Sequence, residues 1–174
     1  LVREGIPATF FLQTKYYRDF QDEGFFNDRT LAAMDALVAA GMEIASHSVS
    51  HSDMYASLPL GDGSEQYPTY QPRVKALGDT QGATVMGELR VSRFLLEQLT
   101  GRSVVSFRPG YLATPPRLPE ALAASGYRFS SSATAGNLTT HLPFRTNTQR
   151  MYSDETTVFE FPIAIEDEIP PIMD

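Results

Sequence analysis

Two of the three histidines in the chain, His47 and His51, lie four residues apart directly after a short apolar run at residues 42–46. If His47 ends a buried strand and the chain then turns helically, this spacing places both imidazoles on one side of the turn. Neutral imidazole is the commonest protein metal ligand, and a catalytic zinc-type site needs about three protein ligands plus a water. The pair therefore predicts a metal site that two histidines alone cannot complete.

The alternative interpretation is that both histidines are ordinary polar residues of a loop between strands. The pair does not fit the zincin helix, because Ser48 stands where that motif needs its general-base glutamate. The chain has no cysteine, so any metal must be held by histidine and carboxylate. Asp53 is the nearest carboxylate, but on a helical turn it would point sideways from the histidine face, so we do not expect it to be the third ligand. Lone His141 is predicted to be a packed or solvated loop residue.

A second candidate for chemistry is Arg108, which follows a β-branched and aromatic run at residues 104–107 and begins an Arg-Pro-Gly-Tyr sequence. An arginine that leaves a strand beside a Pro-Gly turn has its guanidinium fixed for binding a carboxylate. The same turn exposes backbone N–H groups that suit a developing oxyanion. The structural alternative is a common Pro-Gly turn with no catalytic role.

Length and composition bound the possible functions. A chain of 174 residues with 42% apolar content has the size of one domain and can bury a core. The formal charge of −7 and the pI near 4.9 argue against a nucleic-acid or anionic-membrane partner and favour a neutral substrate. No apolar run approaches the roughly 18–20 residues of a membrane span. The compartment and the oligomeric state stay open.

The order of the predicted elements indicates an α/β fold. Apolar, β-branched runs alternate with segments of helical periodicity, which is the pattern of a parallel sheet. The predicted strands are residues 6–13, 42–46, 104–107, 127–131 and 157–165. The predicted helices begin at the capping residue Asp28, at Val85 and at Leu118, and each is ended by a glycine. The candidate site residues follow strand ends, as in a β/α barrel or an open doubly wound sheet.

Residues 52–82 form a predicted long loop, rich in Gly, Pro, Tyr and Asp and without periodicity. Its tyrosines, Tyr55, Tyr67 and Tyr70, could stack on sugar or aromatic rings beside the site. The alternative is that they pack onto the wall of the fold.

Five segments, in this order, resemble the polysaccharide deacetylase (NodB-homology, carbohydrate esterase family 4) domain. They are residues 7–12 (Pro-Ala-Thr-Phe-Phe-Leu), 46–51 (Ser-His-Ser-Val-Ser-His), 107–111 (Phe-Arg-Pro-Gly-Tyr), 126–132 (Gly-Tyr-Arg-Phe-Ser-Ser-Ser) and 160–162 (Glu-Phe-Pro). The resemblance covers nearly the whole chain. It implies a distorted β/α barrel, of which residues 1–174 would be an incomplete middle portion of one catalytic domain, lacking the first strand and the last elements.

The resemblance also implies an activity and its residues. The family's enzymes remove acetyl groups from N- or O-acetylated polysaccharides or related glycans, using a metal-activated water to attack the acetyl carbonyl. His47 and His51 would be metal ligands, the backbone N–H of Tyr111 would contribute to the oxyanion hole, and Arg108 would hold the catalytic-base aspartate. The implied cofactor is a divalent metal, zinc first, with cobalt, nickel or manganese as alternatives.

Four departures from the family pattern bear on this expectation. The Asp-Asp pair that supplies the base and the third metal ligand is expected before Leu1, and the Leu-x-His that carries the general acid is expected beyond Asp174. Ser130 stands where the family usually has an aspartate that tunes this histidine, and Gly110 stands where proline is usual. The 174 residues alone are therefore expected to be inactive.

Two alternatives to a glycan deacetylase remain. One is a non-catalytic carbohydrate-binding relative of the same fold, which Ser130 motivates. The other is a deacetylase-like hydrolase of a small non-peptide amide. An Asp-Asp pair upstream of Leu1 would favour an enzyme over the binding relative, and substrate profiling would separate the two hydrolases.

Overall fold

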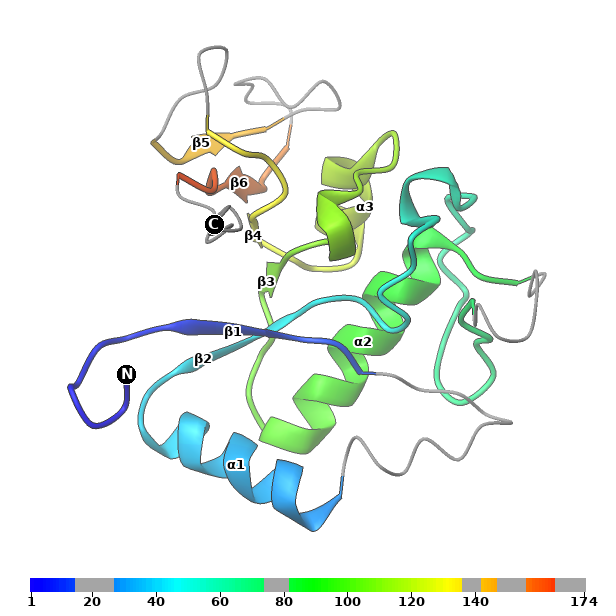
Figure 1. Ribbon diagram of the computed structural model, residues 1–174. Coiled ribbons are helices and arrows are strands. Elements are labelled where there is room, and N and C mark those ends of the chain that lie inside the picture. The colour runs from blue at the N-terminus through cyan, green and yellow to red at the C-terminus, as the bar shows by residue number, and fades with distance from the viewer. Residues whose placement is uncertain (15–26, 74–81, 136–141, 147–155, 165–174) are drawn as a thin grey trace, which may run out of the picture.

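The computed structural model describes residues 1–14, 27–73, 82–135, 142–146 and 156–164 (Figure 1). These residues form a mixed α/β fold around one six-stranded sheet with the strand order β1-β2-β3-β4-β6-β5. The strands are β1 Thr9–Leu12, β2 Glu43–Ser46, β3 Ser106–Phe107, β4 Phe129–Ser130, β5 Phe144–Arg145 and β6 Phe159–Glu160. All neighbours pair in parallel except β5, which is antiparallel to β6. The parallel pairing brings the carboxyl ends of five strands to the same edge.

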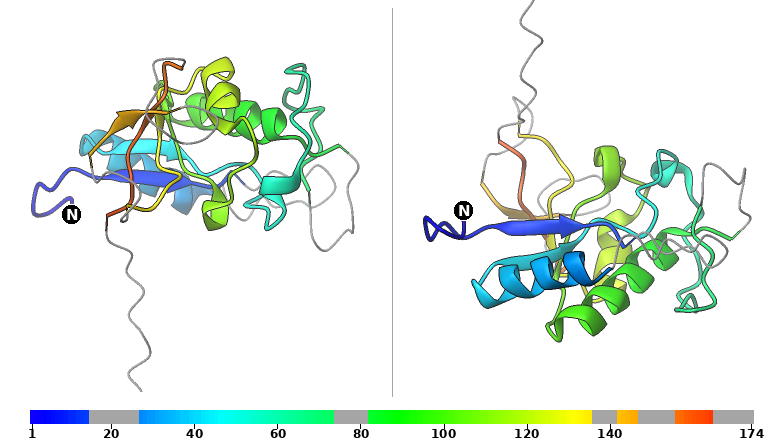
Figure 2. Two further views of the ribbon diagram at one scale, coloured as in Figure 1. Left: turned by 90° about the horizontal axis from the view of Figure 1, so that it is seen from above. Right: turned by 60° about the horizontal axis from the view of Figure 1, so that its bottom comes forward.

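Three α-helices connect the parallel strands: α1 Asp28–Ala39, α2 Val85–Thr100 and α3 Leu118–Ala124. Helices α1 and α2 contact β2 and each other, and α3 contacts α2. Figure 2 shows α1 and α2 lying on the same side of the sheet. Helices α1 and α2 thus cover one face of the sheet, as expected for a β/α fold.

The main core lies between α2 and the strands. Helix α2 contributes Leu89 and Leu96, both fully buried, and the strand β3 contributes Phe107. The side chain of Thr84 caps the first turn of α2 by accepting a hydrogen bond from the Gly87 N–H. Because α2 also contacts β2, whose end precedes the two histidines, its position affects the candidate site directly.

The predicted fold class is confirmed as a mixed α/β sheet with parallel strands, consistent with an incomplete barrel. The five predicted strands occur, but each is shorter than predicted. Strand β5 was missed, because Phe144 and Arg145 follow Pro143 in a largely polar stretch, without the apolar, β-branched run that marks the other two-residue strands. The predicted cap of α1 was wrong by one residue: Asn27 accepts the Arg29 and Thr30 N–H groups, and Asp28 is the first helical residue.

Most of the predicted loop is described, namely residues 52–73 and 82. Tyr55 and Tyr70 are only 1% and 4% exposed, so for these two the packed alternative is correct. Tyr67 is exposed and stacks on Phe94 of α2 with ring centroids 6.0 Å apart. Within the described residues, no helix is both long enough and apolar enough to cross a lipid bilayer.

The cap of α1 gives a stability prediction. Asn27→Ala removes the acceptor of two backbone N–H groups and should lower the free energy of unfolding by about 1 kcal/mol. Asp28→Ala removes only an exposed charge that interacts with the helix dipole, for an expected loss of about 0.3 kcal/mol. Urea unfolding of both variants measures the difference. An equal or larger loss of unfolding free energy in Asp28→Ala would show that Asp28 is the capping residue.

Candidate active site

The two histidines come together at the carboxyl end of β2. His47 directly follows the strand, and the ring centroids of His47 and His51 are 4.7 Å apart. A helical turn was expected here, but the turn is not helical, because Ser48 and His51 adopt positive φ angles of 66° and 49°. The expected proximity holds although the expected geometry of the turn does not. A role of the pair as metal ligands stays a prediction.

One hydrogen bond sets the tautomer of His47. Its Nδ1 lies 2.7 Å from the backbone carbonyl of Arg108. Since a carbonyl oxygen only accepts, Nδ1 must carry the proton and donate it, which leaves the lone pair on Nε2 for another partner. Burial lowers the pKa of His47, and this keeps the imidazole neutral near pH 7. A neutral imidazole whose other nitrogen donates to a carbonyl is the usual state of a metal-binding histidine.

His51 packs against the turn that follows β3. This turn includes a short 3-10 segment, Gly110–Leu112, in which Tyr111 has a φ of 54°. The rings of His51 and Tyr111 have centroids 4.6 Å apart, and Tyr111 is otherwise 71% exposed. A Cβ atom on Gly110 would lie 2.7 Å from Cδ2 of His51, so the imidazole occupies space that only glycine leaves open. Gly110 therefore lets the His51 ring pack directly against this turn.

Arg108 has unused hydrogen-bonding capacity. Its Nη2 donates to Ser131 Oγ at 2.8 Å, and its guanidinium lies over the Phe11 ring at 4.5 Å. Its Nε is buried and has no hydrogen-bond partner among the described residues. Burial lowers the pKa of Arg108 and the charge of Glu160 opposes this, but a guanidinium remains protonated at neutral pH. A planar donor held in this way suits a carboxylate.

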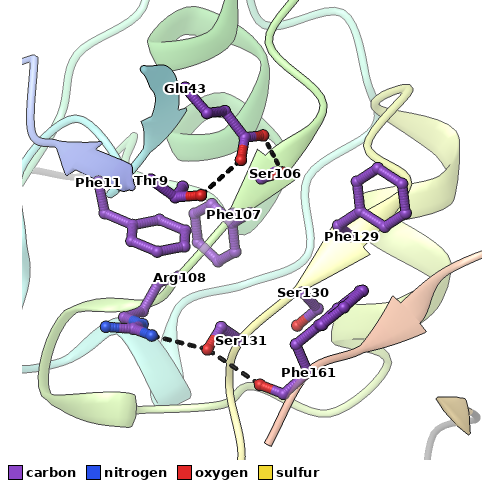
Figure 3. A pocket seen from close by; sticks show the side chains of 10 residues that line it. All are labelled: Thr9, Phe11, Glu43, Ser106, Phe107, Arg108, Phe129, Ser130, Ser131 and Phe161. Atoms are coloured by element: carbon purple, nitrogen blue, oxygen red, sulfur yellow. Dashed lines mark hydrogen bonds between the residues drawn. The ribbon is translucent and has the colours of Figure 1, made fainter. Parts of the chain in front are cut away.

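Arg108 faces a cavity of about 450 Å³ (Figure 3). Four phenylalanine rings form its apolar walls: Phe11, Phe107, Phe129 and Phe161. At one end Glu43 accepts hydrogen bonds from the hydroxyls of Thr9 and Ser106, and at the other Arg108 donates to Ser131. Apolar walls with a few polar groups are typical of small-molecule pockets.

Ser130 belongs to a buried network that ends on a carboxylate. Ser130 Oγ donates to Ser132 Oγ at 3.1 Å, and Ser132 Oγ donates to Glu160 Oε2 at 2.8 Å. The other oxygen of Glu160 accepts the N–H groups of Ser132 and Ala133. Ser130 and Glu160 are direct partners in the pairing of β4 and β6. The negative charge of this region therefore lies on the neighbouring strand and not at position 130.

The described residues contain no group of three or more histidine, aspartate or glutamate side chains that could hold a metal ion. The Asp53 carboxylate pairs with Arg73 Nη1 at 2.9 Å. His141 lies outside the described residues. His47 and His51 thus fit two positions of a divalent-metal site, since both are imidazoles and the tautomer of His47 leaves Nε2 available.

The sequence reasoning missed two buried acidic residues near the site, Glu88 and Glu160. Glu160 was noted only as part of the Glu-Phe-Pro segment. Its position within an apolar strand was a sign that this carboxylate is buried. Glu88 falls between Val85 and Leu89 on the apolar face of α2, where an acidic residue is unusual. A charged residue inside an apolar stripe was thus the available sign in both cases.

Comparison with known proteins places the fold. No curated protein matches the sequence. A candidate polysaccharide deacetylase from Mycobacterium smegmatis has a similar structure with a TM-score of 0.60 at 18% identity, covering 94% of this chain and 43% of its own. The allantoinase Puue gives a TM-score of 0.55 at 18% identity, covering 94% and 40% of the two chains. The deacetylase PplD of Streptococcus pyogenes, in complex with acetate, gives 0.50 at 13%, covering 95% and 56%.

These similarities establish the fold, and the chain spans less than half the length of the first two structures. The family assignment comes from the sequence itself. The sequence profile of the polysaccharide deacetylase family matches residues 1–130, about three quarters of the chain. The chain belongs to the polysaccharide deacetylase family.

Proposed function

We propose that this chain is part of a metal-dependent hydrolase that removes acetyl groups from an N- or O-acetylated polysaccharide or a related glycan. The observation that carries the proposal is the pair of imidazoles 4.7 Å apart, with Nδ1 of His47 bound to the Arg108 carbonyl. Family membership supports the substrate class. A divalent ion bound at such a site, with zinc the first candidate, supplies an activated water and polarises the acetyl carbonyl.

Three residues of the chain have distinct parts in this proposal. His47 and His51 would hold the ion through neutral nitrogens, and Arg108 would orient a carboxylate that removes the proton of the attacking water. Such a carboxylate would satisfy the Nε that has no partner among the described residues.

The backbone N–H of Tyr111 would donate a hydrogen bond to the developing oxyanion. It donates no hydrogen bond within the described part of the chain, and it lies in the turn against which the His51 ring packs. A donor that is already oriented toward developing charge stabilises the transition state without reorganisation.

The first test is removal of each imidazole in the complete encoded protein. His47→Ala and His51→Ala should each lower zinc affinity by more than about a hundredfold and abolish acetate release from acetylated chito-oligosaccharides. Both variants should keep the circular dichroism of the wild type, because the rings lie at a strand end and outside the main core. Full activity in either variant would remove the metal site from the proposal.

Substrate profiling separates the proposal from its two alternatives. Acetate release from acetylated glycans is the expected result. Hydrolysis of small amides alone would identify a different hydrolase, and glycan binding without hydrolysis would identify the non-catalytic relative.

Arg108→Lys should reduce kcat on the order of ten- to a hundredfold with little change in KM. A lysine ammonium keeps the charge but cannot make the planar two-pronged contact with a carboxylate. Zinc affinity should be unchanged, because the backbone carbonyl that orients His47 remains. Steady-state kinetics and zinc titration of the same preparation test both statements, and unchanged kinetics would make Arg108 purely structural.

Gly110→Ala should weaken zinc binding at least tenfold. The added methyl group would lie 2.7 Å from Cδ2 of His51 and displace the ring. Gly82→Ala is the matched control, because there the nearest atom would be at 3.8 Å, an ordinary contact. Calorimetric zinc titration of the two variants decides it, and equal affinities would show that His51 tolerates displacement.

A further inference from the structure

Glu88 of α2 is a fully buried carboxylate beside the turn that carries the two histidines. Its Oε2 accepts the N–H of Val49 at 2.9 Å and that of Ser50 at 2.8 Å. These two amides lie between His47 and His51 in the chain. One oxygen atom from a helix thus binds two of the three backbone N–H groups that separate the two imidazoles in the chain.

Other contacts also support the turn. Ser46 Oγ accepts the Ser48 N–H, Ser48 Oγ accepts the His51 N–H, and the Ser48 carbonyl accepts the N–H of Thr14 at 3.2 Å. The positive φ angles of Ser48 and His51 are unfavourable for residues with a side chain. Such a conformation persists only where the surroundings impose it, and the carboxylate of Glu88 is the side chain that binds the two amides lying between these two residues.

Glu88 is itself held in place by Tyr70. The Tyr70 hydroxyl donates to Glu88 Oε1 at 3.0 Å and accepts the N–H of Thr84 at 3.3 Å. The Tyr70 ring lies so close to α2 that a Cβ atom on Gly87 would be 2.0 Å from it. The carboxylate therefore has both oxygens engaged and little freedom to move.

Burial raises the pKa of Glu88 above its ordinary value, and the hydrogen bonds from the Ser50 and Val49 N–H groups and the Tyr70 hydroxyl offset only part of this shift. Glu88 does not line the cavity that Arg108 faces, and its Oε2 binds the backbone of the turn while its Oε1 accepts the Tyr70 hydroxyl. These contacts are those of a group that fixes a backbone segment.

We propose that Glu88 is a positioning residue, which sets the separation and orientation of His47 and His51 by holding the Val49 and Ser50 amides. The proposal rests on the metal site of the proposed function. It predicts that the reach of the side chain matters more than its charge, because both amides are bound by a single oxygen. Glutamine can supply that oxygen at the same place, whereas aspartate keeps the charge but is one methylene too short.

The test compares Glu88→Asp with Glu88→Gln in the complete encoded protein. Glu88→Asp should lower zinc affinity at least tenfold, and Glu88→Gln should stay within about threefold of the wild type. Glu97→Asp is the matched control, because Glu97 lies on the same helix and also accepts a backbone N–H, that of Val104, but is remote from the turn. It should leave zinc affinity unchanged.

A second readout does not depend on the metal. In the metal-free protein, nuclear Overhauser contacts between the ring protons of His47 and His51 should be present in the wild type and in Glu88→Gln, and lost in Glu88→Asp. This measurement remains informative even if zinc binds elsewhere. Unchanged zinc affinity in His47→Ala would reveal that the proposed metal site is wrong, independently of the role of Glu88.

Either of two results overturns the proposal. If Glu88→Asp retains both the zinc affinity and the ring contacts, Glu88 does not position the histidines. If Glu88→Gln loses both while Glu88→Asp keeps them, the charge and not the reach of the side chain is what the turn requires.

Discussion

The candidate site depends on satisfying the backbone of a turn that has no regular secondary structure. The turn after β2 lies inside the protein, with Val49 fully buried, and it lacks helical hydrogen bonds. An unsatisfied buried N–H costs about 1–3 kcal/mol, so a conformation that leaves two of them unpaired would not be populated. The carboxylate of Glu88 removes this cost at Val49 and Ser50 simultaneously. Helix α2 thereby fixes the path of the chain between the two imidazoles.

The same arrangement, one carboxylate oxygen that binds two consecutive N–H groups, occurs a second time in the sheet. After β4, the consecutive amides of Ser132 and Ala133 are both bound by Oε1 of Glu160, which is 1% exposed. In both places a carboxylate from a neighbouring element accepts two successive N–H groups just after a parallel strand ends. Glu88 and Glu160 thus each bind two consecutive backbone N–H groups, in the segments that follow β2 and β4.

The fold was predictable from periodicity, and the pairing of His47 with His51 was predictable from their spacing. The conformation of the turn between them was not predictable. Its positive φ angles are supported by a contact with α2, which lies some forty residues further along the chain. Glu88 was missed for the same reason: sequence spacing does not reveal which backbone a buried carboxylate meets. Strand β5 was missed because no apolar, β-branched run surrounds it, and the cap at Asn27 was missed because its neighbour Asp28 is an equally good capping residue.

Arg108 connects two parts of the candidate site through different atoms. Its carbonyl fixes the His47 ring, while its guanidinium faces the cavity and donates to Ser131. A side-chain substitution reaches only the second of these, whereas a one-residue insertion or deletion near β3 would shift both and turn the side chain to the other face of the sheet. In evolutionary terms, chain length at this strand should be invariant among functional homologues even where the side chains around it diverge.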